Sequence, residues 1–298
     1  LRSGQTKQAL AIAQALTPRE PGNASFHNLL GLARARGGDT PGAKLAFEKA
    51  LSLAPGQTAP QFNLARLDMA AKAYPAAEAR LAAVLKANER DIDALLEMAS
   101  LFKLRGQPAQ VQHWLQKAND FAPADELRPG FGLIELHLRE NRPAQALEAS
   151  KQLLTKGREQ VPVLLAHSRV LMANGDIPGA RTTLGNATRL AAFEASAQVD
   201  IAALQLRIDN LPGAAYSLEK ALSSQPDHLP ALAMMTEVET RQGEFEKAEQ
   251  RARDIIKRAP KRAVGHTLLG SVALARKQTA GAVTAYRGAP KAGPSTDT

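Results

Sequence analysis

Small residues recur along this chain at a fixed interval. An alanine, or once a valine, stands at Ala9, Ala43, Ala77, Val111, Ala146, Ala180, Ala214, Ala248 and Ala282. Every step is 34 residues except the step from Val111 to Ala146, which is 35. So regular a spacing predicts a chain of structural repeats rather than one globular core.

Apolar residues follow each small residue at helical offsets. Four residues later come Phe47, Leu81, Leu115, Leu184, Leu218 and Tyr286, and seven residues later come Ala50, Val84, Ala118, Leu153, Ala187, Ala221 and Ile255. These offsets place the residues on one face of a helix. Proline stands twelve residues after the small residue, at Pro21, Pro55, Pro123, Pro226, Pro260 and Pro294, and predicts the end of that helix.

A turn former lies five residues before the small residue, at Gly4, Gly38, Gly106, Asn141, Gly175 and Gly243. Because Gly and Asn tolerate the left-handed conformation that ends a helix, each repeat is predicted to be helix A, a tight turn, helix B and a linker. The full repeats are predicted at 24–57, 58–91, 92–126, 127–160, 161–194, 195–228, 229–262 and 263–296, and 1–23 is a partial repeat. With no polar capping helix after the last repeat, we expect the chain to be a piece of a longer repeat protein.

This pattern resembles the tetratricopeptide repeat. That family has small residues at repeat positions 8, 20 and 27, an apolar residue at position 24 and proline at position 32. The segment 24–57 carries the pattern best, with Leu30, Gly31, Ala43, Phe47, Ala50 and Pro55. The resemblance implies an all-α fold, a right-handed superhelical solenoid of antiparallel helix–turn–helix units that forms a single domain over 1–298.

Several residues depart from the family pattern. Position 8 is Ile134 in one repeat and Thr236 in another, and position 32 is Glu89, Arg158 or Ala192 in place of proline. We expect these departures to alter the local packing, especially around 127–194, and to leave the fold unchanged.

A finer resemblance concerns the Ala-, Leu- and Arg-rich texture, as in the segment 62–67. It is similar to the tetratricopeptide lipoproteins that accompany bacterial exopolysaccharide and exosortase (PEP-CTERM) systems. This resemblance implies a periplasmic or cell-envelope protein, and a cytoplasmic location stays open.

Net charge and composition narrow the partner classes. The chain carries a formal net charge of +9, and its clearest basic cluster is Arg251, Arg253, Lys257, Arg258, Lys261 and Arg262. Acidic residues are interleaved with these cations, so the cluster is either a site for an acidic partner or a solvated helix face. Aromatic residues do not interleave with the basic ones, and we therefore expect no nucleic-acid partner. No apolar run approaches the length of a transmembrane helix.

Motifs for catalysis, cofactors and metals do not occur in the sequence. There is no phosphate-binding loop, dinucleotide fingerprint, nucleophile elbow or zinc helix. Cysteine is absent, and the six histidines are scattered along the repeats. We predict no catalytic residues, no cofactor and no metal, and hence a protein that is not an enzyme.

The family geometry implies where a partner would bind. Helix A of each repeat lines a concave groove, and repeat positions 2, 5, 9, 12 and 13 face it. The residues predicted to bind a partner there are Asn28, Phe62, Arg66, Arg128, Phe131, Glu135, Arg169, Arg207, Glu237 and Arg241. Arginine pairs with carboxylates and phenylalanine anchors apolar side chains, so a protein segment with acidic character is the expected ligand.

Position 13 has two interpretations. It is arginine at Arg2, Arg36, Arg139, Arg207 and Arg241. Either these side chains form a ladder that binds the partner, or they interact with free carbonyls and the dipole at the end of helix A.

The overall function has three competing hypotheses. The first is a non-enzymatic protein-interaction scaffold in an envelope or exopolysaccharide assembly. The second is a carbohydrate- or anion-binding module that uses a basic groove, with steep salt dependence. The third is a regulatory solenoid domain of a larger enzyme.

The repeat phasing makes a direct prediction. Ala43→Trp or Ala180→Trp overfills the contact between helices A and B and should lower the free energy of unfolding by about 1–3 kcal/mol or more. Thermal unfolding of both variants measures this. An unchanged melting temperature in both would show that the phasing is wrong.

Overall fold

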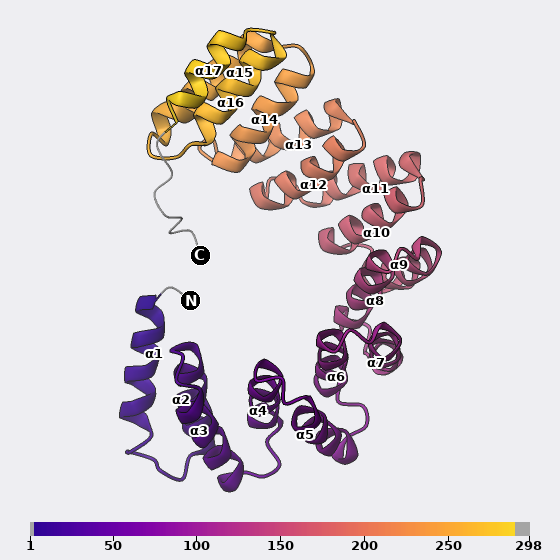
Figure 1. Ribbon diagram of the computed structural model, residues 1–298. Coiled ribbons are helices and arrows are strands. Elements are labelled where there is room, and N and C mark those ends of the chain that lie inside the picture. Colours follow the sequence, from indigo (N-terminus) through magenta and orange to yellow (C-terminus); the bar gives the residue numbers. More distant parts are fainter. Residues whose placement is uncertain (1–2, 290–298) are drawn as a thin grey trace. The chain divides into compact units, whose positions relative to one another are not determined.

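The computed structural model describes residues 3–289, and within that range it contains helices and no strand (Figure 1). The expected all-α class is thus confirmed. The helices are α1 Ser3–Leu16, α2 Ala24–Arg36, α3 Thr40–Leu53, α4 Thr58–Ala70, α5 Tyr74–Ala87, α6 Ile92–Leu104, α7 Pro108–Phe121, α8 Arg128–Arg139, α9 Pro143–Gly157, α10 Val161–Ala173, α11 Ile177–Leu190, α12 Ala195–Arg207, α13 Leu211–Ser224, α14 Leu229–Arg241, α15 Phe245–Arg258, α16 Val264–Ala275 and α17 Thr279–Arg287.

The helices follow one another as antiparallel pairs. The even-numbered helices α2 to α16 are the A helices, and each is followed within a few residues by its B helix. The densest packing joins the two helices of a pair, such as α2 with α3 and α12 with α13. B helices also pack against the next A helix, as α3 does against α4 and α13 against α14.

The chain divides into two compact units. Unit 1 is Leu1–Leu136 and unit 2 is His137–Thr298, so the division falls inside α8. Neighbouring helix pairs stack in sequence order within each unit. The continuation of this stacking into one solenoid over 1–298 stays a prediction.

The small residue at position 20 lies where helices A and B come closest. Ala43, Ala77, Ala180 and Ala214 are fully buried, and Val111 is nearly so. A larger side chain at this depth would force the two helices apart. Ala9 in α1 is only half-buried, and among the described residues α1 packs chiefly against α2.

Positions 8 and 24 of a repeat complement each other in size. Gly31 at position 8 lies against the ring of Phe47 at position 24, and Gly270 lies against the ring of Tyr286 in the same way. In other repeats alanine accompanies leucine, as for Ala65 with Leu81 and Ala202 with Leu218, all of them buried.

We call this complementarity of positions 8 and 24 the size rule. It also applies to the repeats that depart from the family pattern at position 8. Thr236 replaces the small residue at position 8, and its repeat carries Ala252 at position 24; both are fully buried. In the same way Ile134 is accompanied in the sequence by Ser150. The larger residue at one position is therefore offset by a smaller one at the other, as close packing requires.

Positions 11 and 23 fix the register between helices A and B. Arg80 Nε donates to Asp68 Oδ2 over 2.7 Å, and Arg251 Nη2 donates to Glu239 Oε1 over 2.6 Å. In a third repeat Ser217 Oγ donates to Gln205 Oε1 over 3.0 Å at these positions. In a fourth, Phe102 stacks on Trp114 with 6.5 Å between ring centroids. The spacing of twelve residues recurs while the chemistry of the pair changes.

The turn between helices A and B needs one left-handed residue. Gly38, Gly106, Gly175 and Gly243 take positive φ there, as predicted, and so does Asn141. Lys72, Asp209 and Lys277 take positive φ at the same repeat position without being glycine or asparagine. The turn geometry is therefore imposed by the packing of the two helices, not by glycine alone.

Four positions differ from the sequence predictions or lie outside the described residues. The spacing predicts a turn at Gly4, but this residue lies inside α1, which begins at Ser3. A helix A packed before it would be needed to impose the turn, and the described chain holds none there. Pro294 and Arg2 lie outside the described residues. Tyr286, expected on a buried face, is 39 % exposed because α17 is the last described helix.

The size rule predicts a compensating pair of substitutions. Gly31→Ala places a Cβ inside the Phe47 ring and should destabilise the protein by about 1–3 kcal/mol, less the helix-propensity gain of about 1 kcal/mol. Adding Phe47→Leu recreates the combination of Ala65 and Leu81 and should restore part of the loss. Urea unfolding of the two single variants and the double variant measures the coupling.

Gly56→Ala is the matched control, because a Cβ at Gly56 meets no atom within 4 Å. Strict additivity of Gly31→Ala and Phe47→Leu would contradict the size rule.

Candidate functional site

All of the predicted binding residues lie on A helices. We call the solvent-facing surface of positions 2, 5, 9, 12 and 13 the A-face. Successive A helices contact one another directly within each unit, as α2 with α4, α4 with α6, and α12 with α14. Successive B helices make little such contact in the described chain. The A helices therefore lie on the inner side of the curve in each unit.

In unit 1 the A-face is crossed by polar bonds between successive A helices. Asn63 Nδ2 donates to Asn28 Oδ1 over 2.9 Å, which joins α4 to α2. Arg66 Nε donates to Glu97 Oε1 over 2.8 Å, which joins α4 to α6. The predicted groove residues Asn28 and Arg66 are thus engaged by neighbours one repeat away.

The same pattern continues from α6 to α8. Arg128 Nη1 donates to Asp93 Oδ1 over 2.7 Å and Arg128 Nε donates to Glu126 over 2.9 Å. Lys103 Nζ donates to Glu135 Oε1 over 2.7 Å. The hydrogen bonds to Glu126 and Asp93 raise the pKa of the Arg128 guanidinium further above its ordinary value. Arg128 and Glu135, both predicted to bind a partner, are therefore neutralised inside unit 1.

In unit 2 the A-face is divided between paired and unpaired arginines. Arg241 Nη2 donates to Asp209 Oδ1 over 2.7 Å, Nη1 donates to the carbonyl of Leu206 over 3.3 Å, and Nη1 lies 3.8 Å from Glu237. Leu206 is in the last turn of α12, so Arg241 caps the preceding A helix.

Arg169 and Arg207 are different. Both are exposed on the A-face, and in the part of the chain that the structure describes neither forms an ion pair. Of the two interpretations of position 13, the capping one describes Arg241, whereas a binding role for Arg207 stays a prediction. Arg36, at the end of α2, is likewise exposed without an ion pair in the described chain, and Arg139 lies 3.7 Å from Glu140.

The two aromatic residues predicted to act as platforms are not exposed. Phe62 is 8 % exposed, and Phe131 is half-buried. The prediction of an open phenylalanine platform at Phe62 is wrong, because position 5 of that repeat turns into the helix packing. Spacing along the chain indicates the helix face of a residue and not the depth of its side chain.

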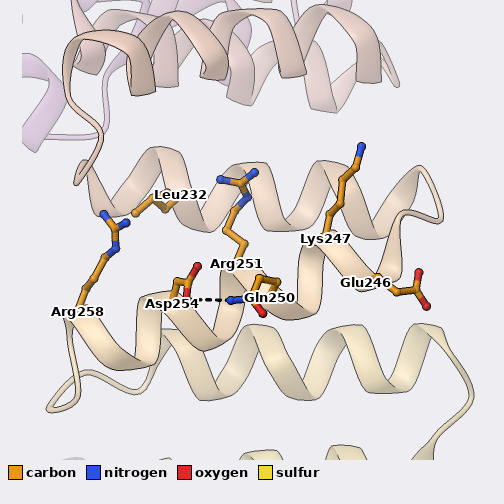
Figure 2. Close-up of a pocket in the computed structure, with 7 residues that line it drawn as sticks. All are labelled: Leu232, Glu246, Lys247, Gln250, Arg251, Asp254 and Arg258. Carbon is orange, nitrogen blue, oxygen red and sulfur yellow. Dashed lines mark hydrogen bonds between the residues drawn. The ribbon is translucent and has the colours of Figure 1, made fainter.

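The basic cluster of α15 is largely paired within the protein. Arg251 bonds Glu239, Arg253 bonds Glu249, Arg258 bonds Asp227, and Lys257 lies 3.6 Å from Asp254, so four of the six cations have a carboxylate partner. Figure 2 shows the hollow of about 470 Å³ beside α15, with Gln250 bonded to Asp254 over 3.1 Å. This surface offers little unpaired charge to an acidic ligand.

No group of three His, Cys, Asp or Glu side chains in the described range is arranged to hold a metal ion. Nor does any described helix have the length and apolarity to cross a membrane.

Comparison with known proteins identifies the repeat. Two sequence profiles, both described as "Tetratricopeptide repeat", match the chain, one over 35–95 and 209–272 and the other over 1–58 and 165–228. Together they cover more than half of the 298 residues. The chain belongs to the tetratricopeptide repeat proteins, a family that generally serves as a non-enzymatic scaffold for protein interactions. A comparison with curated proteins finds no match.

Solved structures show the same fold. Yeast Tom70 is 17% identical with a TM-score of 0.59, and the match covers 95% of this chain and 58% of that chain. The C-terminal part of a repeat-containing protein from Cytophaga hutchinsonii is 12% identical with a TM-score of 0.53, and the match covers 77% of this chain and 94% of that chain. A tetratricopeptide repeat protein from Parabacteroides merdae is 14% identical with a TM-score of 0.50, covering 84% and 98%. At these identities the likeness concerns the fold alone.

The paired cations predict a structural role that is measurable. Arg251→Ala leaves the carboxylate of Glu239, 5 % exposed, without its partner and should lower the free energy of unfolding by about 1–3 kcal/mol. Lys261→Ala, on an exposed residue of the same cluster, should change it by less than about 0.5 kcal/mol. Chemical denaturation of both variants tests this, and equal effects would refute the assignment.

Proposed function

We propose that this chain is a non-enzymatic scaffold that holds a segment of a partner protein on its A-face. The observation that carries the proposal is the contrast among the A-face arginines. Arg66, Arg128 and Arg241 are bonded to carboxylates of a neighbouring repeat. Arg169 on α10 and Arg207 on α12 are exposed without an ion pair in the described chain. In unit 2 these two guanidinium groups are therefore available to a partner.

The chemistry of the two arginines defines the partner segment. A guanidinium group pairs bidentately with a carboxylate, so the segment carries Asp or Glu side chains. Helices α10 and α12 contact each other within unit 2, which places both arginines on one continuous surface. Val199 on α12, at repeat position 5, is exposed only in part and supplies apolar area beside them.

The biological setting is proposed from resemblance alone. The Ala-, Leu- and Arg-rich texture is similar to the lipoproteins of exopolysaccharide and exosortase systems, and we place the scaffold in the periplasm or cell envelope of a bacterium on that basis. A cytoplasmic partner is the alternative outcome of the experiment below.

The experiment is a pull-down from envelope and cytosolic extracts of the source organism, with the chain as bait at low and high salt. We expect one protein to be retained from the envelope fraction and to survive high salt, because apolar contacts add to the ion pairs. Arg169→Ala together with Arg207→Ala should reduce its retention about tenfold or more, since two charged contacts are lost.

Arg181→Ala is the matched control. Arg181 is exposed on the B helix α11, so its loss removes a charge outside the A-face. Equal loss in the control and the double variant would show that net charge, not the A-face, governs binding. Retention of an anionic polysaccharide alone, lost at high salt, would replace the scaffold by a carbohydrate-binding module.

A further inference from the structure

Unit 2 has a large hollow on the side of its B helices. It has a volume of about 1120 Å³ and lies between α9 and α11, with residues of α10 as its floor. Both B helices pack against α10, but they are not packed against each other. The side chains of Leu164, His167 and Leu171 therefore line a groove between two parallel helices.

The floor of this groove is uncharged. Leu164 and Leu171 are buried, and Ser150 Oγ lies 3.0 Å from His167 Nδ1, which holds the ring. Burial lowers the pKa of His167, and the charge of Lys151 lowers it further, against an opposing effect of Asp176. The imidazole is accordingly neutral at pH 7 and adds to the apolar floor.

The walls alternate between apolar and basic side chains. Along α9 and its C-terminal cap, the lining residues Leu147, Lys151, Leu154 and Arg158 follow one another at spacings of four, three and four residues, which places them in one stripe. On α11 the wall includes Arg189 and Leu190, of which Leu190 is 42 % exposed. An apolar floor is thus edged by cations on both sides.

These cations have no internal carboxylate partner. Lys151, Arg158 and Arg189 form no ion pair in the described chain, and Arg189 donates only to the amide of Asn186, over 2.6 Å. The acidic residues at the groove are Glu159 and Asp176, and Asp176 Oδ1 already accepts the backbone N–H of Gly179 over 2.9 Å. The hollow beside α15 is the opposite case, because its cations are paired with Glu244, Glu239 and Asp227.

The groove coincides with the departures from the repeat pattern. Arg158 occupies the position where most repeats have proline. Helix α9 ends at Gly157, one repeat position further than α3, α11 or α13. The substitution places a guanidinium group at the end of this wall.

We propose that the groove between α9 and α11 binds an acidic amphipathic helix of a partner protein. Its leucines form the apolar seat for the ridge of such a helix, and Lys151, Arg158 and Arg189 flank that seat to pair with Asp or Glu on the helix edges. A second copy of this chain, at net charge +9, is a poor match to the same cations. The groove is separate from the A-face and its occupancy does not depend on the function proposed above.

The test uses three fluorescein-labelled peptides of about 16 residues, long enough to form a helix. All three carry leucine at alternating spacings of four and three residues, and the flanking positions are Glu, Gln or Lys. Fluorescence anisotropy with the full chain should show the Glu peptide binding at least about tenfold more tightly than the Lys peptide. Failure of the Glu peptide to bind, or equal binding of all three, would overturn the proposal.

Variants then locate the site. Lys151→Glu together with Arg158→Glu should weaken binding of the Glu peptide about tenfold or more and restore binding of the Lys peptide. Lys156→Glu is the matched control, since it makes the same charge change on α9 outside the groove. Arg169→Ala on the A-face should leave peptide binding unchanged; loss there with an unaffected groove variant would assign the peptide to the A-face instead.

The ring of His167 gives an independent readout. Its NMR resonances should shift on addition of the Glu peptide, whereas those of His113, on α7 in unit 1, should not. An unshifted His167 at saturating peptide would contradict occupancy of the groove.

Discussion

The close contact of helices A and B at position 20 underlies the rest of the structure. An alanine that is fully buried between two helices, as at Ala43, Ala77 and Ala180, sets how near the helix axes come. Once that distance is short, positions 8 and 24 must divide a fixed volume between them, and positions 11 and 23 must meet. The pairs of Gly31 with Phe47 and of Asp68 with Arg80 are consequences of the same approach. The strained turns at Lys72 and Asp209 are tolerated for this reason as well.

Several ion pairs in this chain join neighbouring repeats. The pairs Arg66–Glu97, Arg128–Asp93 and Arg241–Asp209 join residues about one repeat apart, so they align neighbouring A helices rather than stabilise single helices. Exposed pairs of this kind contribute only about 0–1 kcal/mol each, and their main effect is on register and on the surface charge that remains. Among the cations that this network leaves unpaired in the described chain are Arg36, Arg169 and Arg207 on the A-face and Lys151, Arg158 and Arg189 on the B side.

Departures from a repeat pattern are of two kinds here. Thr236 with Ala252 is a compensated exchange that keeps the packed volume and has no further effect on the helices. Arg158 in place of proline is of the other kind, because it adds a guanidinium group to the rim of a groove. The sequence predicts altered packing around 127–194, and unit 2 presents its large basic-edged groove there while the backbone helices remain regular. Close packing fixes the volume of a repeat core, so functional variation is placed at its linkers and outer surfaces.

The sequence by itself determined the repeat length, the all-α class, the phase of helices A and B and the helix face of each residue, since all of these follow from spacing along one chain. It also pointed to Arg241 as either a cap or a ligand, but could not choose, because the carbonyl of Leu206 lies in another repeat. Only the tertiary structure decided that Phe62 is buried, that the cations of α15 are paired and that those between α9 and α11 are not. The physical reason is that depth and charge pairing depend on side chains about 12 to 35 residues away, brought together by helix packing, whereas periodicity reports only on neighbours within a few turns.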